Sequence, residues 1–265
     1  VVAPWGIELT LIDTSDTEAL TAAVSKNTSM VWLETPSNPL LTVSDIAAVA
    51  ELAPANGALL ACDNTVATPA GQNPLAHGAD LVMHSTTKFI GGHSDVTGGV
   101  VVAAEATPYF DKVRAYQSIG GAVPGPFDCW LLLRSVASLP CRFAAQARNA
   151  DKVAAFLRDL PGIERVCYPG LTDHPGHGIA VNQMKSFGAL LSVLFERGRD
   201  AALSAVNRVK LFTQATSLGG VESLIEHRAS AEGPNTRTPE NLLRISVGLE
   251  NPQDLIADLR QAFNP

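Results

Sequence analysis

The sequence predicts an α/β fold, and two observations support this. In the first half of the chain, short apolar runs alternate with stretches of helical periodicity, and polar residues gather where the apolar runs end. This alternation is typical of a mostly parallel sheet with helices on both faces. Hydrophobic residues make up 46% of the chain and charged residues 17%, which is typical of a compact globular enzyme and unlike a disordered or fibrous chain.

The strands of this first sheet are predicted from the apolar runs. The run at residues 30–34 ends in a loop that Pro36 and Pro39 enforce. Ser44 is then expected to cap a helix that extends to about Asn56 and that Gly57 ends. The expected strands of the sheet are residues 30–34, 59–62, 80–84 and 97–103.

The second half of the chain predicts a smaller α/β unit. From residue 127 to about residue 160 the pattern is helical, and strands and helices follow it. The expected strands are residues 162–167, 188–195 and 242–247, and the expected helices are residues 199–209 and 252–263. We therefore predict a large domain over residues 1–145 and a smaller C-terminal domain over residues 146–265.

The first residues of the chain have a pattern that is typical of the interior of a domain. The first residue is Val1 and not Met, and residues 7–13 have the alternating pattern of a strand. We therefore expect that an N-terminal portion is missing from this sequence.

Charge and composition exclude several classes of partner. The formal net charge is -7 and no run of Lys and Arg is present, so neither nucleic acid nor an anionic membrane is expected to bind. The apolar runs are too short to span a membrane. The histidines lack the spacing of a zinc site, so no metal is expected. The four cysteines are scattered along the chain: Cys62, Cys129, Cys141 and Cys167. We interpret them as buried or free thiols of a cytoplasmic protein, and a disulfide between two of them is left as an alternative.

Polar residues cluster after three of the predicted strands. In parallel sheets, ligands bind in the crevice beyond the carboxyl ends of the strands. The convergence of polar groups at that edge therefore predicts a binding site there. The residues concerned are Asn38, Asp63 with Thr65, and Ser85 with Thr87 and Lys88.

Lys88 lies in the segment that is richest in polar and glycine residues, residues 80–95. A lysine held in a cleft loses part of its hydration, which lowers its pKa and makes its amine a usable nucleophile. Ser85 and Thr87 could donate hydrogen bonds to a phosphate beside it. Spacing alone does not separate this reading from a surface lysine in a glycine-rich loop. A phosphate-loop nucleotide site is set aside, because its motif requires Ser or Thr directly after the lysine, where this chain has Phe89.

The segment from Asp80 to Ser94 closely resembles the cofactor-lysine signature of the Cys/Met-metabolism family of pyridoxal-phosphate (PLP) enzymes. This family includes cystathionine γ-synthase, cystathionine γ-lyase, cystathionine β-lyase and methionine γ-lyase. Four further segments match in family order: residues 34–39, 62–65, 217–224 and 243–250. The resemblance implies the type I fold of PLP-dependent transferases, in which a mostly parallel sheet binds the cofactor and a smaller α/β domain follows.

The resemblance also implies roles for the cofactor-binding residues. Lys88 would be the catalytic residue, which holds the cofactor as an aldimine and then moves protons along the substrate. Asp63 would face the pyridine nitrogen and keep it protonated, and Thr65 would lie near the ring. Ser85 and Thr87 would bind the phosphate. From the residues alone, a loop aspartate that caps a turn is the favoured reading of Asp63, and a loop or capping role stays open for Thr65, Ser85 and Thr87.

The substrate-binding residues implied by the resemblance lie in other segments. Arg244 would hold the substrate α-carboxylate through two parallel hydrogen bonds, and its apolar neighbours indicate that it is not fully exposed. Ser217 would help to bind the same carboxylate or the lysine. Asn38 would contact both the cofactor and the substrate. The chain departs from the family pattern at Thr216 and over residues 228–234, where Arg228 stands in place of the usual Pro.

The implied function is a transsulfuration enzyme that acts at the γ-carbon of sulfur amino acids, of the cystathionine γ-synthase or γ-lyase type. β-Lyase or methionine γ-lyase activity stays open, as does a catalytically impaired fragment that lacks the N-terminal phosphate-binding region. A homo-oligomer built as a dimer of dimers with shared active sites is implied by the resemblance alone.

Overall fold

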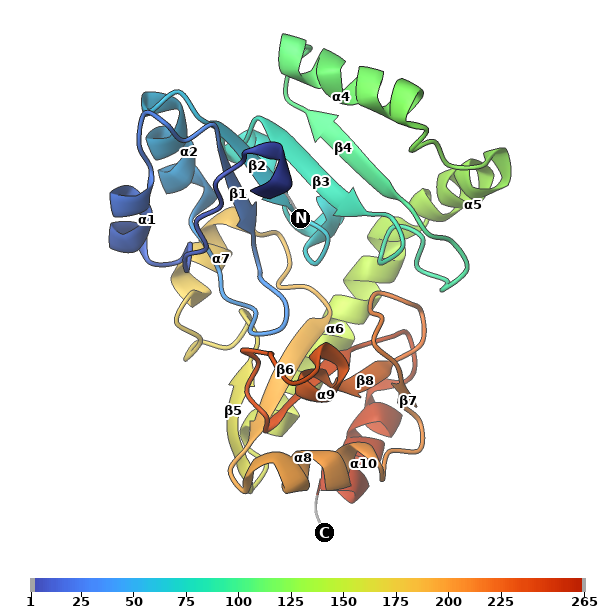
Figure 1. Cartoon of the computed structure of the whole chain (residues 1–265). Helices are drawn as coiled ribbons and strands as arrows, with labels where there is room; N and C mark the ends of the chain where they lie inside the picture. Colours follow the sequence, from blue (N-terminus) through green and yellow to red (C-terminus); the bar gives the residue numbers. More distant parts are fainter. Residues whose placement is uncertain (1–2, 264–265) are drawn as a thin grey trace.

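The computed structural model describes residues 3–263, which form two β-sheets joined by the long helix α6, Leu139–Arg158 (Figure 1). Helices pack against both sheets, in agreement with the α/β prediction, but Met30 and Trp32 on one face of the first sheet stay 43% and 50% exposed. No helix within residues 3–263 combines the length and the apolar character needed to cross a membrane. The remaining helices are η1 Ala3–Trp5, α1 Thr17–Ala23, α2 Ile46–Ala55, α3 Thr68–Gly71, η2 Pro74–His77, α4 Pro108–Gly120, α5 Pro126–Val136, α7 His177–Gln183, α8 Gly198–Val206, α9 Arg228–Glu232 and α10 Pro252–Phe263.

The first sheet has the strand order β1-β2-β3-β4. Strands β1 to β3 are parallel and β4 is antiparallel to β3, so the sheet is mostly parallel, as predicted. The register pairs Glu34 with Asp63 and Asp63 with Met83, and the parallel strands therefore end at one edge. The strands are β1 Met30–Glu34, β2 Leu59–Asp63, β3 Leu81–Ser85 and β4 Gly99–Ala103.

Helix α2 begins one residue later than predicted. Asp45, and not Ser44, is its N-cap, and the Asp45 carboxylate accepts a hydrogen bond from the backbone N–H of Ala48 at 3.1 Å. The predicted cap was wrong because the Ser44 hydroxyl bonds elsewhere, with the Thr14 hydroxyl at 2.7 Å. Gly57 follows the helix with a φ of +80°, a left-handed conformation that suits glycine and ends the helix as expected.

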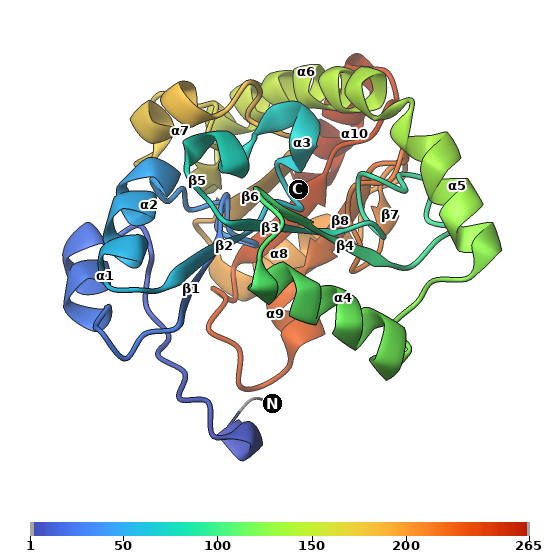
Figure 2. The ribbon, with the colours of Figure 1, turned by 90° about the horizontal axis from the view of Figure 1, so that it is seen from above.

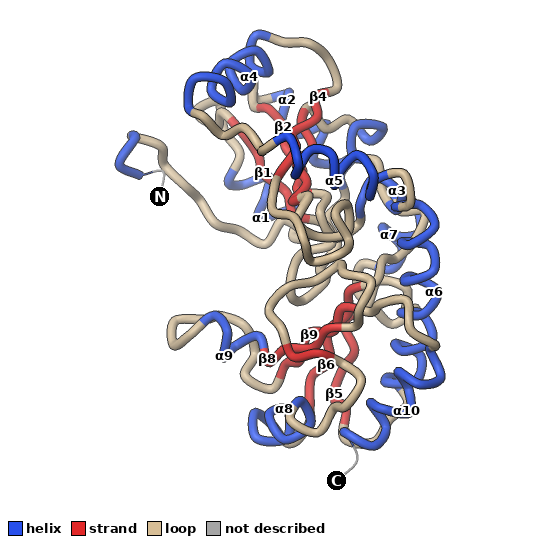
Figure 3. Tube along the Cα trace, turned by 90° about the vertical axis from the view of Figure 1, so that its right-hand side faces the viewer, coloured by secondary structure: helices blue, strands red, loops and turns tan. Residues whose placement is uncertain are grey.

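The predicted strand at residues 7–13 is absent. These residues are irregular, and the apolar side chains of Ile7, Leu9 and Leu11 are more than half exposed. Figure 3 shows this leading segment standing away from both sheets. The prediction was wrong because apolar alternation specifies a strand only when a neighbouring strand pairs with it, and none of the strands in the described chain does.

The second sheet has the order β5-β6-β9-β8-β7, with only the short β7–β8 pair parallel. Helices α6 and α10 pack on one face and α8 on the other (Figure 3). Every residue of β6, β8 and β9 is buried, which gives this sheet a core on both faces. The strands are β5 Ile163–Cys167, β6 Leu190–Phe195, β7 Thr213–Gln214, β8 Leu224–His227 and β9 Leu242–Ser246.

The predicted domain boundary between residues 145 and 146 falls inside α6. Leu139 and Phe143 at the start of this helix share one buried cluster with Phe89 of the first sheet's loops and with Leu190 and Ile245 of the second sheet. In the view of Figure 2, α6 runs across the top of the molecule and ties the two sheets together. The division into two domains therefore stays a proposal, with α6 belonging to both.

Candidate active site

Lys88 lies in the loop that connects β3 to β4. Its amine donates a hydrogen bond to the Ser217 hydroxyl at 3.2 Å, so a residue 129 positions away in sequence meets it. Burial lowers the pKa of the Lys88 amine below its usual value of 10.5, and the positive charges of Arg244 and Arg228 lower it further, against the opposing effect of Glu226. A lysine in this state offers the neutral amine that acts as a nucleophile.

The loop after β3 is held from one side by Arg142 of α6. This guanidinium is 7% exposed and donates to the backbone oxygens of Phe89 at 2.9 Å, Ile90 at 3.2 Å and Ser135 at 3.1 Å. Its Nε donates to the Ser138 hydroxyl at 3.0 Å. A buried cation is tolerated here because carbonyl oxygens satisfy its donors. Arg142 was not predicted from the sequence as a residue of this region.

The same loop is approached closely from the other side by Gly219. A Cβ at this position would lie 2.6 Å from the backbone nitrogen of Phe89 and 3.0 Å from the carbonyl carbon of Lys88. Its φ of +81° is also left-handed, and the Ser246 hydroxyl fixes it by accepting its backbone N–H at 2.8 Å. Only glycine meets both conditions, so the segment after Ser217 is built to contact the lysine loop.

Asp63 is the last residue of β2, and Thr65 links it to the next strand. The backbone N–H of Thr65 donates to the Asp63 carboxylate at 2.9 Å, while the Thr65 hydroxyl accepts from the backbone N–H of Ser85 at 2.8 Å. Buried His84 lies in β3 nearby; its desolvation lowers its pKa, and the charge of Asp63 acts in the opposite direction. Asp63, Thr65 and Ser85 therefore form one group at the carboxyl edge of the first sheet.

Ser85 and Thr87, the two residues predicted to bind a phosphate, differ in the hydrogen bonds that their hydroxyl groups already make. The Thr87 hydroxyl donates to the backbone oxygen of Gly98 at 3.3 Å and accepts from its N–H at 3.0 Å. The Ser85 hydroxyl makes no hydrogen bond to another residue among those described. Ser85 is thus the freer of the two to bind an anion.

Arg244 lies in the middle of β9 and is 2% exposed, in agreement with the expectation from its apolar neighbours. Its Nη1 donates to the side-chain oxygen of Asn38 at 3.1 Å. Its Nη2 donates to the backbone oxygens of Thr216 at 2.7 Å and Ser217 at 2.9 Å. The structure therefore joins Lys88, Ser217, Arg244 and Asn38 in one chain of contacts.

A buried carboxylate, Glu226, faces Arg244 across the β8–β9 pair. The register places the two residues opposite each other, and they form an ion pair in which both side chains are 5% exposed or less. The same oxygen, Oε1, lies 3.3 Å from Nη1 of Arg228. Burial raises the pKa of the Glu226 carboxyl, and the two arginines oppose that rise. Its Oε2 is buried without a hydrogen-bond partner in the described chain.

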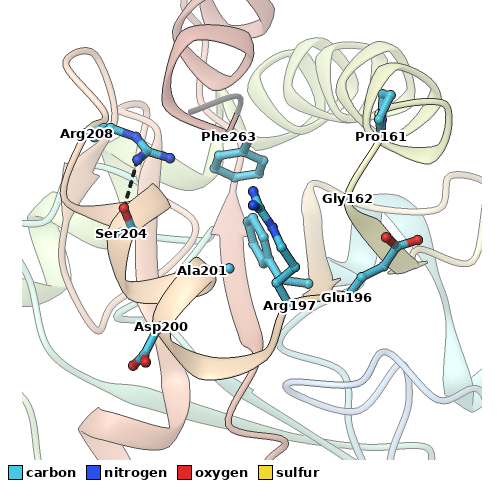
Figure 4. A pocket seen from close by; sticks show the side chains of 10 residues that line it. Pro161, Gly162, Glu196, Arg197, Asp200, Ala201, Ser204, Arg208 and Phe263 are labelled. Atoms are coloured by element: carbon cyan, nitrogen blue, oxygen red, sulfur yellow. Dashed lines mark hydrogen bonds between the residues drawn. The ribbon is translucent and has the colours of Figure 1, made fainter.

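A hollow of about 600 Å³ lies elsewhere, at the far end of the second sheet beside α8 (Figure 4). Phe195, Phe263 and the charged Arg197 and Arg208 line it, and Arg208 donates to the Ser204 hydroxyl at 2.7 Å. It contains none of the residues predicted for the site. Its volume therefore does not outweigh the buried charges gathered around Lys88 and Arg244.

The chain is similar to several enzymes named for sulfur amino acids. It is 46% identical to cystathionine γ-synthase of Mycobacterium tuberculosis, over 99% of this chain and 69% of that protein. It is 44% identical to cystathionine γ-lyase of Bacillus subtilis, over 97% and 70%, and 44% identical to L-methionine γ-lyase of Fusobacterium nucleatum, over 98% and 68%.

Solved structures agree with this likeness. The crystal structure of metB from Corynebacterium glutamicum superposes with a TM-score of 0.96 at 46% identity, over 100% of this chain and 70% of that chain. The methionine γ-lyase CalE6 from Micromonospora echinospora gives a TM-score of 0.94 at 40% identity, over 99% of this chain and 73% of that chain. These matches confirm the predicted α/β fold class. The family model of the Cys/Met metabolism PLP-dependent enzymes matches residues 1–264, and the chain belongs to that family.

Proposed function

We propose that this protein uses pyridoxal 5'-phosphate, held covalently by Lys88, to act at the γ-carbon of sulfur amino acids. The observation that carries the proposal is the contact of the Lys88 amine with Ser217, whose backbone in turn binds Arg244. One set of contacts thus joins an activated amine to a buried guanidinium. An amine and a carboxylate-binding group in such proximity suit an enzyme of amino acids.

The residues at the edge of the first sheet fit the cofactor. When bound, pyridoxal phosphate supplies an aldehyde for covalent attachment and a ring that accepts the electrons of a carbanion. Asp63 would keep the ring nitrogen protonated, Thr65 would lie beside the ring, and Asn38 would bond to a ring oxygen. The unengaged hydroxyl of Ser85 would bind the phosphate, with Thr87 in a supporting place because Gly98 already occupies its hydroxyl.

The substrate would be oriented from the second sheet. Arg244 would hold its α-carboxylate, because a planar guanidinium fixes a carboxylate in one orientation. The amino group of the substrate would first replace the Lys88 amine in the covalent link, which frees Lys88 to act as a base. Lys88 would then accept the proton of the α-carbon, pass it to the bound cofactor, and accept a proton from the β-carbon, so that the γ-substituent leaves with the electron pair of its bond. Two transfers by one base require a flexible amine. The Ser217 hydroxyl, which accepts a hydrogen bond from this amine at 3.2 Å, would position it for both.

The products formed from cystathionine test the proposal directly. Purified protein incubated with pyridoxal phosphate and cystathionine should release cysteine and 2-oxobutyrate, and omission of the cofactor should stop the release. Homocysteine with pyruvate would instead establish cleavage at the β-carbon. Formation of cystathionine from cysteine and an activated homoserine ester would place the enzyme with the synthases.

Methionine γ-lyase activity is a second candidate, because the Fusobacterium nucleatum and Micromonospora echinospora relatives carry that name at 44% and 40% identity. It acts at the same carbon, so the residues have the same roles. Release of methanethiol from methionine at a rate comparable with cystathionine cleavage would favour it.

We also propose that the protein forms homo-oligomers in the cytoplasm. Large apolar side chains are exposed along α4 and α5, among them Ile119 at 88%, Leu133 at 72% and Tyr116 at 71%. Exposed apolar surfaces of this kind are typical of protein contacts. The four cysteines are free, which suits a reducing compartment. Light scattering should give a mass that is a multiple of the monomer; a monomer at every concentration would refute the oligomer.

A further inference from the structure

We propose that Glu226 and Arg228 are positioning residues that exchange a carboxylate at Arg244 when the substrate binds. In the free protein Glu226 occupies Arg244; when a substrate carboxylate arrives, Glu226 releases Arg244 and remains paired with Arg228. This inference rests on the proposed function, because it takes Arg244 as the group that binds the substrate carboxylate.

Nη2 of Arg244 has fewer hydrogens than acceptors around it. Its Nη2 carries two hydrogens, yet three acceptors surround it: the backbone oxygens of Thr216 and Ser217 and the Oε1 of Glu226. A guanidinium binds a carboxylate in two parallel bonds through Nη1 with Nη2 or through Nε with Nη2. Both modes include Nη2. One of its present acceptors must therefore leave before a substrate carboxylate binds in this way.

Glu226 is the acceptor that can leave. The other two acceptors are main-chain oxygens of the segment that also carries Ser217, which bonds to Lys88. A side chain, by contrast, can change rotamer without moving the backbone. The buried Oε2 of Glu226, which has no partner among the described residues, gives this carboxylate an unused oxygen with which to make new bonds.

Arg228 provides the partner that Glu226 needs after the exchange. A buried carboxylate left without a partner is strongly unfavourable. Nη1 of Arg228 is already 3.3 Å from Oε1 of Glu226, and Nε of Arg228 is 2.7 Å from Glu232, which anchors its position within α9. The Arg228 side chain is 23% exposed, so it lies at the border between the buried pair and solvent and can adjust as Glu226 turns.

Ligand binding by the cofactor-loaded protein tests the exchange without turnover. The probes are L-norleucine, which has an α-carboxylate and no leaving group, and n-pentylamine, which is the same molecule without the carboxylate. Dissociation constants are measured by spectral titration and by calorimetry. Arg228→Met should weaken norleucine binding by about tenfold, because Glu226 then has no second partner. Pentylamine binding should change by less than about twofold, since it does not compete for Arg244.

A double-substitution cycle separates exchange from simple attraction of the ligand by Arg228. In a Glu226→Gln background, residue 226 carries no negative charge that must stay paired with Arg228 when it leaves Arg244. Arg228→Met should therefore no longer affect norleucine binding. Arg228→Lys should restore part of the loss. Arg158→Met is the matched control, since Arg158 is a solvent-exposed arginine that pairs with Asp159 on the surface; it should leave both ligands unaffected.

Three outcomes would overturn the inference. Equal losses for norleucine and pentylamine in Arg228→Met would indicate a general structural effect. A norleucine loss that persists in the Glu226→Gln background would indicate direct attraction. If the wild-type protein binds neither probe, the proposed function fails together with the exchange, whereas the first two results leave the proposed function intact.

Discussion

The two sheets bring polar groups to the candidate site in different ways. The first sheet carries Lys88 and Thr65 on loops beyond the ends of its parallel strands. The second sheet carries Arg244 inside a strand, with all five residues of β9 buried. A group on a loop needs only a neighbour to fix its direction. The buried charge of Arg244 is instead balanced by backbone oxygens and by a buried counter-charge, which Glu226 supplies.

This difference suggests that the two sheets have separate roles in the site, which can be tested. The first sheet would determine how the cofactor is held, and the second would determine how the substrate is oriented. Substitutions in the two sheets should therefore alter different kinetic quantities.

The largest effect is expected at Lys88 in the first sheet's loop. Lys88→Ala should abolish the visible absorbance of the covalently held cofactor and lower kcat by about 10³-fold or more, because both the attachment point and the base are lost. Lys185→Ala, at an exposed lysine, is the control and should retain both. An unchanged cofactor spectrum in Lys88→Ala would contradict the assignment.

Asp63→Asn should lower kcat by roughly 10²-fold while the KM for substrate changes little. The amide cannot keep the ring nitrogen protonated, so the ring accepts electrons less well. Asp80→Asn is the control: the Asp80 carboxylate accepts the backbone N–H of Leu60 at 2.7 Å, toward the opposite end of β2 from Asp63. It should lower stability and leave kcat intact. A large KM change in Asp63→Asn would break the proposed division.

Arg244→Lys should raise KM by about 30-fold with a smaller change in kcat. Lysine keeps the charge but loses the planar fork that binds a carboxylate through two bonds. Steady-state kinetics over a wide substrate range would measure this split. If kcat fell while KM stayed constant, the second sheet would not be the substrate-orienting part of the site.

The smallest effect expected is on pH dependence. Because burial and nearby arginines lower the pKa of the Lys88 amine, the neutral nucleophilic form is present at lower pH than in a free lysine. The rate of cofactor attachment to the apoprotein should therefore rise with pH and reach half its maximum below pH 10.5. A midpoint at or above that value would show that the amine is not desolvated as described.

The sequence predicted the first sheet better than the second because the two differ in pattern. Short apolar runs that end in polar residues identify β1, β2 and β3 directly. Strand β8 was missed, since Glu226 and His227 make half of its four residues polar although all four are buried. An acidic residue is not expected in a buried strand, so Glu226 conceals the strand in the sequence. Its burial is explained by the ion pair with Arg244.

The site was predictable in the same unequal way. Polar residues at strand ends pointed to Asp63 and Lys88 from pattern alone. Arg244 and Ser217 were named only through family resemblance, because no local pattern tells which distant segments meet. Glu226, Arg228 and Arg142 were not assigned to the site at all. The Glu226–Arg244 ion pair and the bond from Arg142 to Phe89 join residues that are far apart in the sequence, and such contacts become visible only in the folded chain.

The covalent position of the cofactor is the most direct test of the account. Reduction of the cofactor-loaded protein with borohydride should fix the link, and peptide mapping by mass spectrometry should find the pyridoxyl group on Lys88. A label distributed over several lysines, or found on one other than Lys88, would contradict the account.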